Sequence, residues 1–316
     1  MPTQLPPRID RHAHLEGSLD PAWVRLQAAQ AGRQVPATLE ALWRREVINF
    51  EGFIEAFFFV CGFIRSAEVA KEALRACVSR LAPAGEGARG IDLWVSPHFL
   101  VKQGAFLSLE ELWRGLDEGI QEAREQGVHI AVIIDAVNHF GIEHGKEVLD
   151  LVLPEKPSWV VGFSTGGLER VPFREWAPVF DRARQAGLRL AAHAGENGPG
   201  SNVREAILEA GVERIVHGVR AAKDPAILEL LAERHIALDS CISSNRALVP
   251  DLGPHPLPSL LRAGVRCALG TDDPGVIPCD IPWEWQQAKG LGLSEIELEA
   301  LRTHAVEDAW CMALGA

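Results

Sequence analysis

The amino-acid sequence predicts an α/β fold, a (β/α)8 TIM barrel with a helical insertion after the first strand. Three observations lead to this class. Eight short β-rich runs alternate with amphipathic helical stretches along the 316 residues. Several of these runs are apolar throughout, as in parallel strands that are covered on both faces. No glycine-rich phosphate loop follows the first run, which disfavours a doubly wound open sheet, the alternative architecture.

The predicted elements follow one another in a regular order. Strands are expected at residues 8–14, 91–99 (IDLWVSPHF), 129–137 (HIAVIIDAV), 159–164 (WVVGFS), 189–194 (RLAAHA), 214–217 (RIVH), 237–241 (ALDSC) and 266–271 (RCALGT). Helices are expected between them, at residues 108–126, 173–187, 202–210 and 224–235. The motifs Ser108-x-x-Glu111 and Ser294-x-x-Glu297 predict capping boxes at two helix starts.

The connection after the first strand departs from this alternation of strands and helices. Residues 19–90 contain no predicted strand, and four helical patterns cover residues 21–31, 39–47, 50–64 and 67–81. A long excursion from the catalytic end of a barrel predicts a lid or a pocket wall. Its phenylalanines are expected to pack mostly between helices, while some could form an apolar wall for a flat ring. They are Phe50, Phe53, Phe57, Phe58, Phe59 and Phe63. Residues 1–316 are expected to form one domain.

Composition and charge narrow the function classes. The chain has 31 basic and 43 acidic side chains, a net charge of −12, so it lacks the basic surface of a nucleic-acid-binding protein. A small molecule is the expected partner. The six scattered cysteines include no C-x-x-C pair, which favours buried free thiols. No signal-like segment or membrane-length apolar run is present, so a cytoplasmic location without a membrane partner is expected. Nothing in the sequence indicates an oligomeric state.

Two histidines of the first predicted strand suggest a metal site. His12 and His14 are two residues apart, so both side chains face the same side of a strand. Neutral imidazoles that converge in this way suit a divalent cation. The pair alone is weak evidence, because histidines often satisfy ordinary hydrogen bonds. Further ligands must come from other strands.

Ionisable residues lie at or just after the ends of three other predicted strands. His193 and Glu196 lie in "HAGEN", His217 ends "RIVH", and Asp272 and Asp273 lie in "GTDDPG". The C-terminal ends of barrel strands meet at one face, where barrel enzymes place their active sites. Buried charges are costly unless they are paired or bound to a metal.

These positions predict a single metal centre. His12, His14, His193 and Asp272 form a set of three imidazoles and a carboxylate, which fits one Zn²⁺ per chain, with iron or manganese less suited. Glu196 is then expected to act as an acid or base beside the metal.

His217 is expected either to orient or to deprotonate the attacking water, and Asp273 to contact the substrate. As isolated features, the histidine could equally be a core residue and Asp-Asp-Pro a turn.

The motifs "HAHLEGSL", "HAGEN", "RIVHGV" and "GTDDP", in this order, resemble the adenosine/adenine deaminase family of metal-dependent hydrolases. The resemblance extends from residue 8 to the C-terminal helix. It implies the same four zinc ligands. It further implies that Glu196 protonates the purine ring at N1 and that His217 handles the water that attacks C6. Asp273 matches the partner of N7, and Gly167 in "GFSTGGLE" matches the glycine whose backbone contacts N3.

The zinc deaminases of the H-x-E and P-C-x-x-C type share none of these motifs, and the chain lacks that signature. Relatives with two metals need a lysine on the fourth strand, and residues 159–167 contain none. One metal is therefore expected.

Several residues depart from the family pattern. Glu16 stands where adenosine enzymes usually carry aspartate at a position that touches the ribose, and glutamate is more usual among relatives acting on adenine or modified nucleosides. Gly167 is retained where adenine-specific members tend to differ. Trp94 and Asn138 replace two arginines that are usual in the family.

The resulting hypothesis is zinc-dependent deamination of a 6-aminopurine nucleoside, with adenosine, converted to inosine and ammonia, as the default substrate. The alternatives are deamination of 6-aminodeoxyfutalosine or of free adenine on the same scaffold. A silent binding protein and a hydrolase of a non-purine substrate are disfavoured, because the full set of implied site residues is retained.

Overall fold

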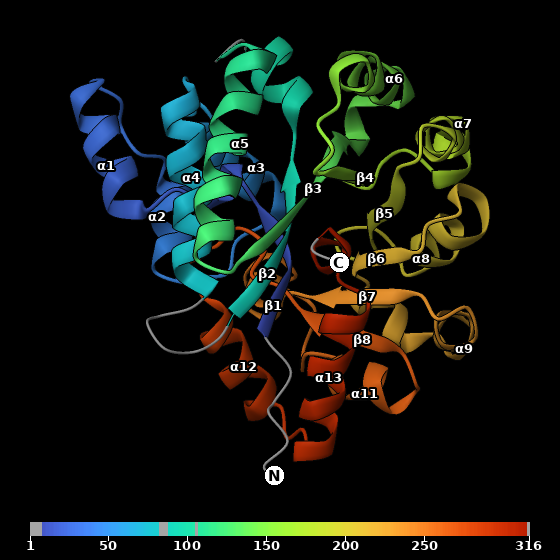
Figure 1. The fold of residues 1–316 in the computed structure, drawn as a ribbon. Coiled ribbons are helices and arrows are strands. Elements are labelled where there is room, and N and C mark those ends of the chain that lie inside the picture. The colour runs from blue at the N-terminus through green and yellow to red at the C-terminus, as the bar shows by residue number, and fades with distance from the viewer. Residues whose placement is uncertain (1–7, 82–87, 105–106, 315–316) are drawn as a thin grey trace.

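A computed structural model describes residues 8–81, 88–104 and 107–314. Eight parallel strands, in the order β1 to β8, form a nearly closed barrel surrounded by helices (Figure 1). A parallel bridge between Ala13 and Asp272 joins β1 to the segment that follows β8. The strands are β1 (Arg8–His14), β2 (Ala88–Val95), β3 (His129–Val137), β4 (Val160–Gly166), β5 (Arg189–Ala194), β6 (Arg214–His217), β7 (Ala237–Ser240) and β8 (Arg266–Leu269). The predicted fold class is confirmed.

Four predicted strands have different ends in the structure. The second was expected to run to residue 99 but ends at Val95, because Pro97 cannot donate to a strand ladder and a π-helix, Phe99–Gln103, follows. The eighth ends at Leu269, just before Gly270, and the seventh one residue before its predicted end. The fourth starts one residue later than predicted and extends to Gly166.

The insertion between β1 and β2 contains the four expected helices. They are α1 (Pro21–Gln30), α2 (Ala37–Trp43), α3 (Phe50–Cys61) and α4 (Ala67–Leu81). They lie together on one side of the barrel, next to α5 (Leu109–Glu125) (Figure 1). The prediction placed the second of these helices at residues 39–47, but it ends earlier, and Arg45 just beyond it has a left-handed φ of 60° that a helix cannot contain.

The remaining helices alternate with strands or close the chain. They are α6 (Ile142–Val152), α7 (Phe173–Gln185), α8 (Ser201–Glu205), α9 (Pro225–Glu233), α10 (Ile242–Leu248), α11 (Leu257–Arg262), α12 (Ile281–Gly290), α13 (Glu295–Glu307) and α14 (Trp310–Ala313). The helix predicted at 202–210 starts as α8 and continues as a π-helix, Ala206–Ala210. Both predicted capping boxes are present, at the starts of α5 and α13.

The N-terminal end of the barrel is filled by buried charges. Arg214 donates to Asp92 at 2.7 Å, and Arg11 lies 3.1 Å from Asp239, with all four side chains fully buried. The first two backbone N–H groups of α14 also donate to Asp92. This end is therefore closed, and a ligand can approach the barrel core from the opposite, C-terminal end.

Two further expectations concern the whole chain. All six cysteines are free and buried, as predicted. Among the residues that the structure describes, no helix has both the length and the apolar character needed to cross a membrane.

Candidate active site

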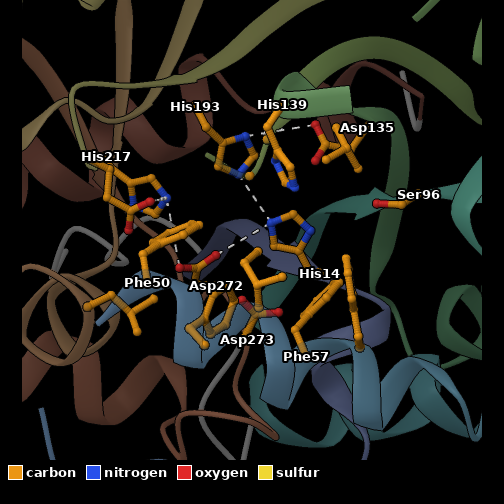
Figure 2. Close-up of a pocket in the computed structure, with 18 residues that line it drawn as sticks. His14, Phe50, Phe57, Ser96, Asp135, His139, His193, His217, Asp272 and Asp273 are labelled. Atoms are coloured by element: carbon orange, nitrogen blue, oxygen red, sulfur yellow. Dashed lines mark hydrogen bonds and ion pairs between the residues drawn. The ribbon is translucent and has the colours of Figure 1, made fainter. Parts of the chain in front are cut away.

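Four predicted ligands from three parts of the chain converge at the C-terminal end of the barrel. The Nε2 atom of His193 lies 3.2 Å from Nε2 of both His12 and His14. The Oδ1 atom of Asp272 lies 3.1 Å from Nε2 of His12 and 3.6 Å from Nε2 of His14. Figure 2 shows His14, His193 and Asp272 pointing towards one another. The histidines come from β1 and β5, and Asp272 follows β8.

Four of the six separations among these donors are close to those of a tetrahedral metal site. Zinc bonds of about 2.0–2.2 Å to nitrogen and oxygen give tetrahedral donor–donor edges of about 3.3–3.6 Å. The four separations lie between 3.1 and 3.6 Å. Ligand atoms of His12, His193, His217 and Asp272 all lie within 4.8 Å of one another, and His14 shares such a group with Asp272 and Asp273. The donor set, three imidazole nitrogens and one carboxylate oxygen, also suits zinc. The residues present therefore fit the metal that the sequence predicted.

The protonation of the imidazoles also suits ligation. Burial lowers the pKa of His12 and His14 well below their usual range, and it lowers the pKa of His193 as well. Neutral imidazole is the form that binds a metal. Nδ1 of His193 donates to the carbonyl oxygen of Thr165 on β4 at 2.9 Å, which leaves the Nε2 lone pair free for the cation.

His217 faces the same centre from β6. Its Nε2 atom lies 3.6 Å from Oε2 of Glu196 and 4.0 Å from Oδ2 of Asp272, whereas Oδ1 of Asp272 faces His12 and His14. His217 and Asp272 both have a φ of 67°, a left-handed conformation that is costly for residues other than glycine. Such strain at two strand ends is typical of functional sites.

The loop that carries Glu196 is held by a second glutamate, Glu169, which follows β4. Its carboxylate accepts hydrogen bonds from the backbone N–H groups of residues 195–198 and from Nδ2 of Asn202, at 2.8–3.1 Å. This arrangement fixes the "HAGEN" turn and with it the direction of Glu196. Sequence reasoning missed Glu169, because its partners are backbone groups that leave no sequence signal.

Three acidic side chains that line the cavity have an oxygen without a protein partner. Oε1 of Glu196, Oδ1 of Asp273 and Oδ1 of Asp135 are buried and make no hydrogen bond within the described residues. Burial, followed by the charges of Asp272 and Glu169, raises the pKa of Glu196 well above its usual range. Burial also raises the pKa of Asp273, with Asp272 adding to the effect. Buried polar atoms of this kind are typical of a site that awaits a polar ligand.

Gly17 explains part of the "HLEGS" motif. A Cβ atom at this position would collide with the Asp273 carboxylate. The glycine therefore leaves the space in which Asp273 lies.

An apolar wall from the insertion covers the cavity beside the predicted ligands. The cavity is lined by Phe50, Phe53, Phe57 and Phe58 of α3, together with acidic and histidine side chains of the barrel (Figure 2). Phe59 and Phe63 instead pack against each other and the Arg33 guanidinium. All six phenylalanines lie in the hydrophobic core or pack against it, as expected, and four of them also line the cavity.

Gly167 lines the cavity as predicted, in a conformation that requires glycine. Its φ is 82°, and a Cβ atom would contact the His139 ring. Nδ1 of His139 accepts from the N–H of Leu168. The Asn138 side chain accepts from the backbone N–H groups of residues 170 and 171. The segment after Gly167 is thus tied to the end of β3.

Glu16 lies behind the cavity wall. Its side chain is fully buried, and Oε1 accepts from the backbone N–H of Ser96 at 2.7 Å. Ser96 lines the cavity, whereas Glu16 is not among the lining residues. Burial raises the pKa of Glu16 to about 7. Trp94 is fully buried in the barrel, with its ring 4.2 Å from that of His12.

Asp135 is a cavity residue that the sequence analysis missed. It lies on β3, and its Oδ1 is 3.9 Å from Nδ1 of His193, on the side of the ring away from the predicted metal position. Burial raises the pKa of Asp135 well above its usual range. A lone acid in the otherwise apolar run "HIAVIIDAV" was the available signal.

Comparison with known proteins agrees with this geometry. The model of the adenosine deaminase family matches residues 7–315. An aminodeoxyfutalosine deaminase of Acidothermus cellulolyticus is 34% identical over 302 residues, covering 91% of this chain and 83% of the relative. An adenine deaminase of Chelativorans sp. is 31% identical over 311 residues, covering 96% and 93%.

Among solved structures, the adenine deaminase of Arthrobacter aurescens superimposes with a TM-score of 0.86 at 27% identity, covering 96% of this chain and 94% of that chain. These relatives are named for adenine and aminodeoxyfutalosine, so the choice of adenosine as default substrate is less well supported than its alternatives. One residue in three shared over almost the full barrel, together with the family model, establishes the relationship. The protein is an aminohydrolase of the adenosine/adenine deaminase family.

Proposed function

We propose that the protein uses Zn²⁺ to replace the 6-amino group of an adenine ring by oxygen, with free adenine as the principal substrate. One observation carries this proposal: the four-donor set adjoins a cavity into which Glu196 and Asp273 bring buried oxygens that have no partner. A flat heteroaromatic ring with several nitrogen atoms can satisfy such oxygens while its faces pack against phenyl groups.

The proposed chemistry assigns a task to each group. His12, His14, His193 and Asp272 would hold the Zn²⁺, and the bound metal would lower the pKa of the attacking water towards neutrality. The remaining tasks belong to the side chains around the ring.

Glu196 donates a proton to ring N1, and burial, which raises the pKa of this carboxyl group, favours the protonated form that the step needs. Asp273 faces N7, and the Gly167 backbone faces N3. Addition of the water oxygen to C6 and departure of ammonia convert adenine into hypoxanthine.

Free adenine is favoured over adenosine by the position of Glu16. This residue matches the ribose-contacting position of the family, but its Oε1 is engaged by the Ser96 backbone and its side chain does not line the cavity. Two of the relatives described above are named adenine deaminases, which supports the same choice.

Aminodeoxyfutalosine is the second candidate substrate. Gly167 is retained where adenine-specific relatives tend to differ, and the relative from Acidothermus cellulolyticus is named for this nucleoside.

Steady-state kinetics of the zinc-loaded enzyme with adenine, aminodeoxyfutalosine and adenosine, following loss of the aminopurine absorbance, will separate the candidates. We expect the highest kcat/KM for adenine. A higher value for aminodeoxyfutalosine would select the second candidate, and no turnover of any of the three would refute the proposal.

The isosteric substitution Glu196→Gln tests the assigned acid. We expect zinc content to stay the same and kcat to fall by about 100-fold or more, because the amide cannot deliver the proton to N1. Elemental analysis and turnover of the same preparation measure both quantities. Turnover close to that of the unmodified enzyme would contradict the assignment.

A further inference from the structure

A chain of buried hydrogen bonds leads from the backbone to His217. The N–H of Leu257, at the start of α11, donates to Nδ1 of His255 at 3.3 Å. Nε2 of His255 lies 3.2 Å from Oδ1 of Asn245, and Nδ2 of Asn245 lies 3.0 Å from Nδ1 of His217. All four residues are buried.

The direction of every bond in this chain follows from its first member. A backbone N–H can only donate, so Nδ1 of His255 must accept. Burial lowers the pKa of His255 to about 3, so the ring is neutral and carries its single proton on Nε2. That proton is donated to Oδ1 of Asn245, which turns the amide nitrogen towards His217.

The amide then determines which nitrogen of His217 is protonated. Nδ1 of His217 accepts from Asn245, so the one proton of the neutral imidazole must be on Nε2. Nε2 faces Oε2 of Glu196 at 3.6 Å and Oδ2 of Asp272 at 4.0 Å. Both distances are longer than a hydrogen bond, so the N–H points at a space that can accommodate a ligand oxygen.

We propose that Asn245 and His255 are positioning residues that hold the proton of His217 on Nε2. His217 then acts as a hydrogen-bond donor to the attacking oxygen and has no lone pair on that side with which to deprotonate it. This decides between the two roles that the sequence left open for His217. The proton of the attacking water goes instead to Oδ2 of Asp272, which lies 4.0 Å from Nε2 of His217.

Substitution of His255 by glutamine or glutamate tests the direction of the chain, because the two side chains have nearly the same shape. In His255→Gln the amide can still donate to Oδ1 of Asn245. In His255→Glu, studied at a pH high enough to ionise the buried carboxyl group, the carboxylate can only accept, so Asn245 turns its amide round and the His217 proton moves to Nδ1. A histidine held in the wrong tautomer costs a catalytic triad about 10⁴ in kcat.

The first measurement is the tautomer itself, read from nitrogen NMR shifts of ¹⁵N-histidine-labelled, zinc-loaded protein. His217→Gln identifies the His217 signals by their loss. We expect protonated Nε2 in the unmodified protein and in His255→Gln, and protonated Nδ1 in His255→Glu. Protonated Nδ1 in the unmodified protein would overturn the proposal, and this measurement needs no stable variant of His255.

The second measurement is steady-state kinetics. We expect kcat of His255→Glu to fall by about 10²- to 10⁴-fold with KM and zinc content unchanged, and His255→Gln to recover most of the rate. Asn245→Asp, which also can only accept from His217, is the second variant if His255→Glu does not fold. A reversed tautomer with undiminished kcat would overturn the proposal.

The kinetic part of this proposal rests on the proposed deaminase function, whereas the NMR part does not. Protonated Nε2 in a protein that turns over none of the three adenine compounds would refute the deaminase proposal alone.

Discussion

Substitution of Glu169 by alanine should disturb both the stability of the fold and the position of Glu196. The Glu169 carboxylate is the common acceptor for four consecutive backbone N–H groups, residues 195–198, and for Nδ2 of Asn202. Alanine removes this acceptor and leaves the "HAGEN" turn without its main support.

The size of the effect follows from the burial of these donors. Bonds to a charged acceptor contribute about 1.5–3 kcal/mol each, but five bonds to one carboxylate do not add independently. The N–H groups of Gly195 and Glu196 belong to buried residues, and an unpartnered buried donor costs about 1–3 kcal/mol. We therefore expect the free energy of unfolding to fall by about 2–6 kcal/mol. A displacement of Glu196 by about 1 Å would lower kcat by about 100-fold.

Urea unfolding and steady-state turnover of the zinc-loaded protein measure the two effects. Glu229→Ala, at an exposed position of α9, is the control for the loss of one carboxylate. Glu169→Gln keeps one oxygen for part of the turn and should lie between the unmodified protein and the alanine variant. If Glu169→Ala matches the control in both unfolding free energy and kcat, the turn does not depend on Glu169 and the reasoning is wrong.

Three further outcomes are expected. Burial raises the pKa of Glu284 from 4.5 to about 7, so the folded state holds this proton more tightly than the unfolded chain does, and the difference corresponds to about 3 kcal/mol. Its contribution therefore makes the free energy of unfolding fall as pH rises from 4.5 to about 7. Glu284→Gln should reduce the difference in unfolding free energy between about pH 5 and about pH 8, measured by urea titration. An unchanged difference would contradict the assignment. Gly17→Ala should push the Asp273 carboxylate aside, raising KM by about 10-fold or more while zinc is retained; an unchanged KM would show that Asp273 does not bind substrate. His14→Ala should lose zinc, and full occupancy by elemental analysis would count against its role as a ligand.

The four-donor set could be predicted because barrel topology brings distant strand ends together. His12 and His14 could be placed by the two-residue period of a strand, and His193 and Asp272 by their positions near the ends of two other strands. The prediction did not depend on the conformation of individual loops. In the structure, four pairs of these donors lie 3.1–3.6 Å apart, which is consistent with one shared centre.

Residues whose roles depend on loop conformation could not be predicted from the sequence. Asn245 lies on α10, a short helix that no periodic pattern revealed, and the direction of its amide depends on the backbone N–H of Leu257, twelve residues further along. Glu16 was expected to face a ribose, but strand β2 ends early at Val95 and brings the Ser96 N–H against its carboxylate. The left-handed φ of His217 could not be foreseen, since such values favour glycine.

The closure of the N-terminal end of the barrel by α14 affects how a newly made chain folds. The Asp92 carboxylate accepts hydrogen bonds from two N–H groups at the start of α14, and this helix is translated only after all eight strands have been made. Until those groups arrive, Asp92, Arg214 and their neighbours keep their hydration, because dehydrating incompletely paired ions costs several kcal/mol each. A ribosome-bound intermediate that lacks α14 would therefore keep water around the charged residues at the N-terminal end of the barrel.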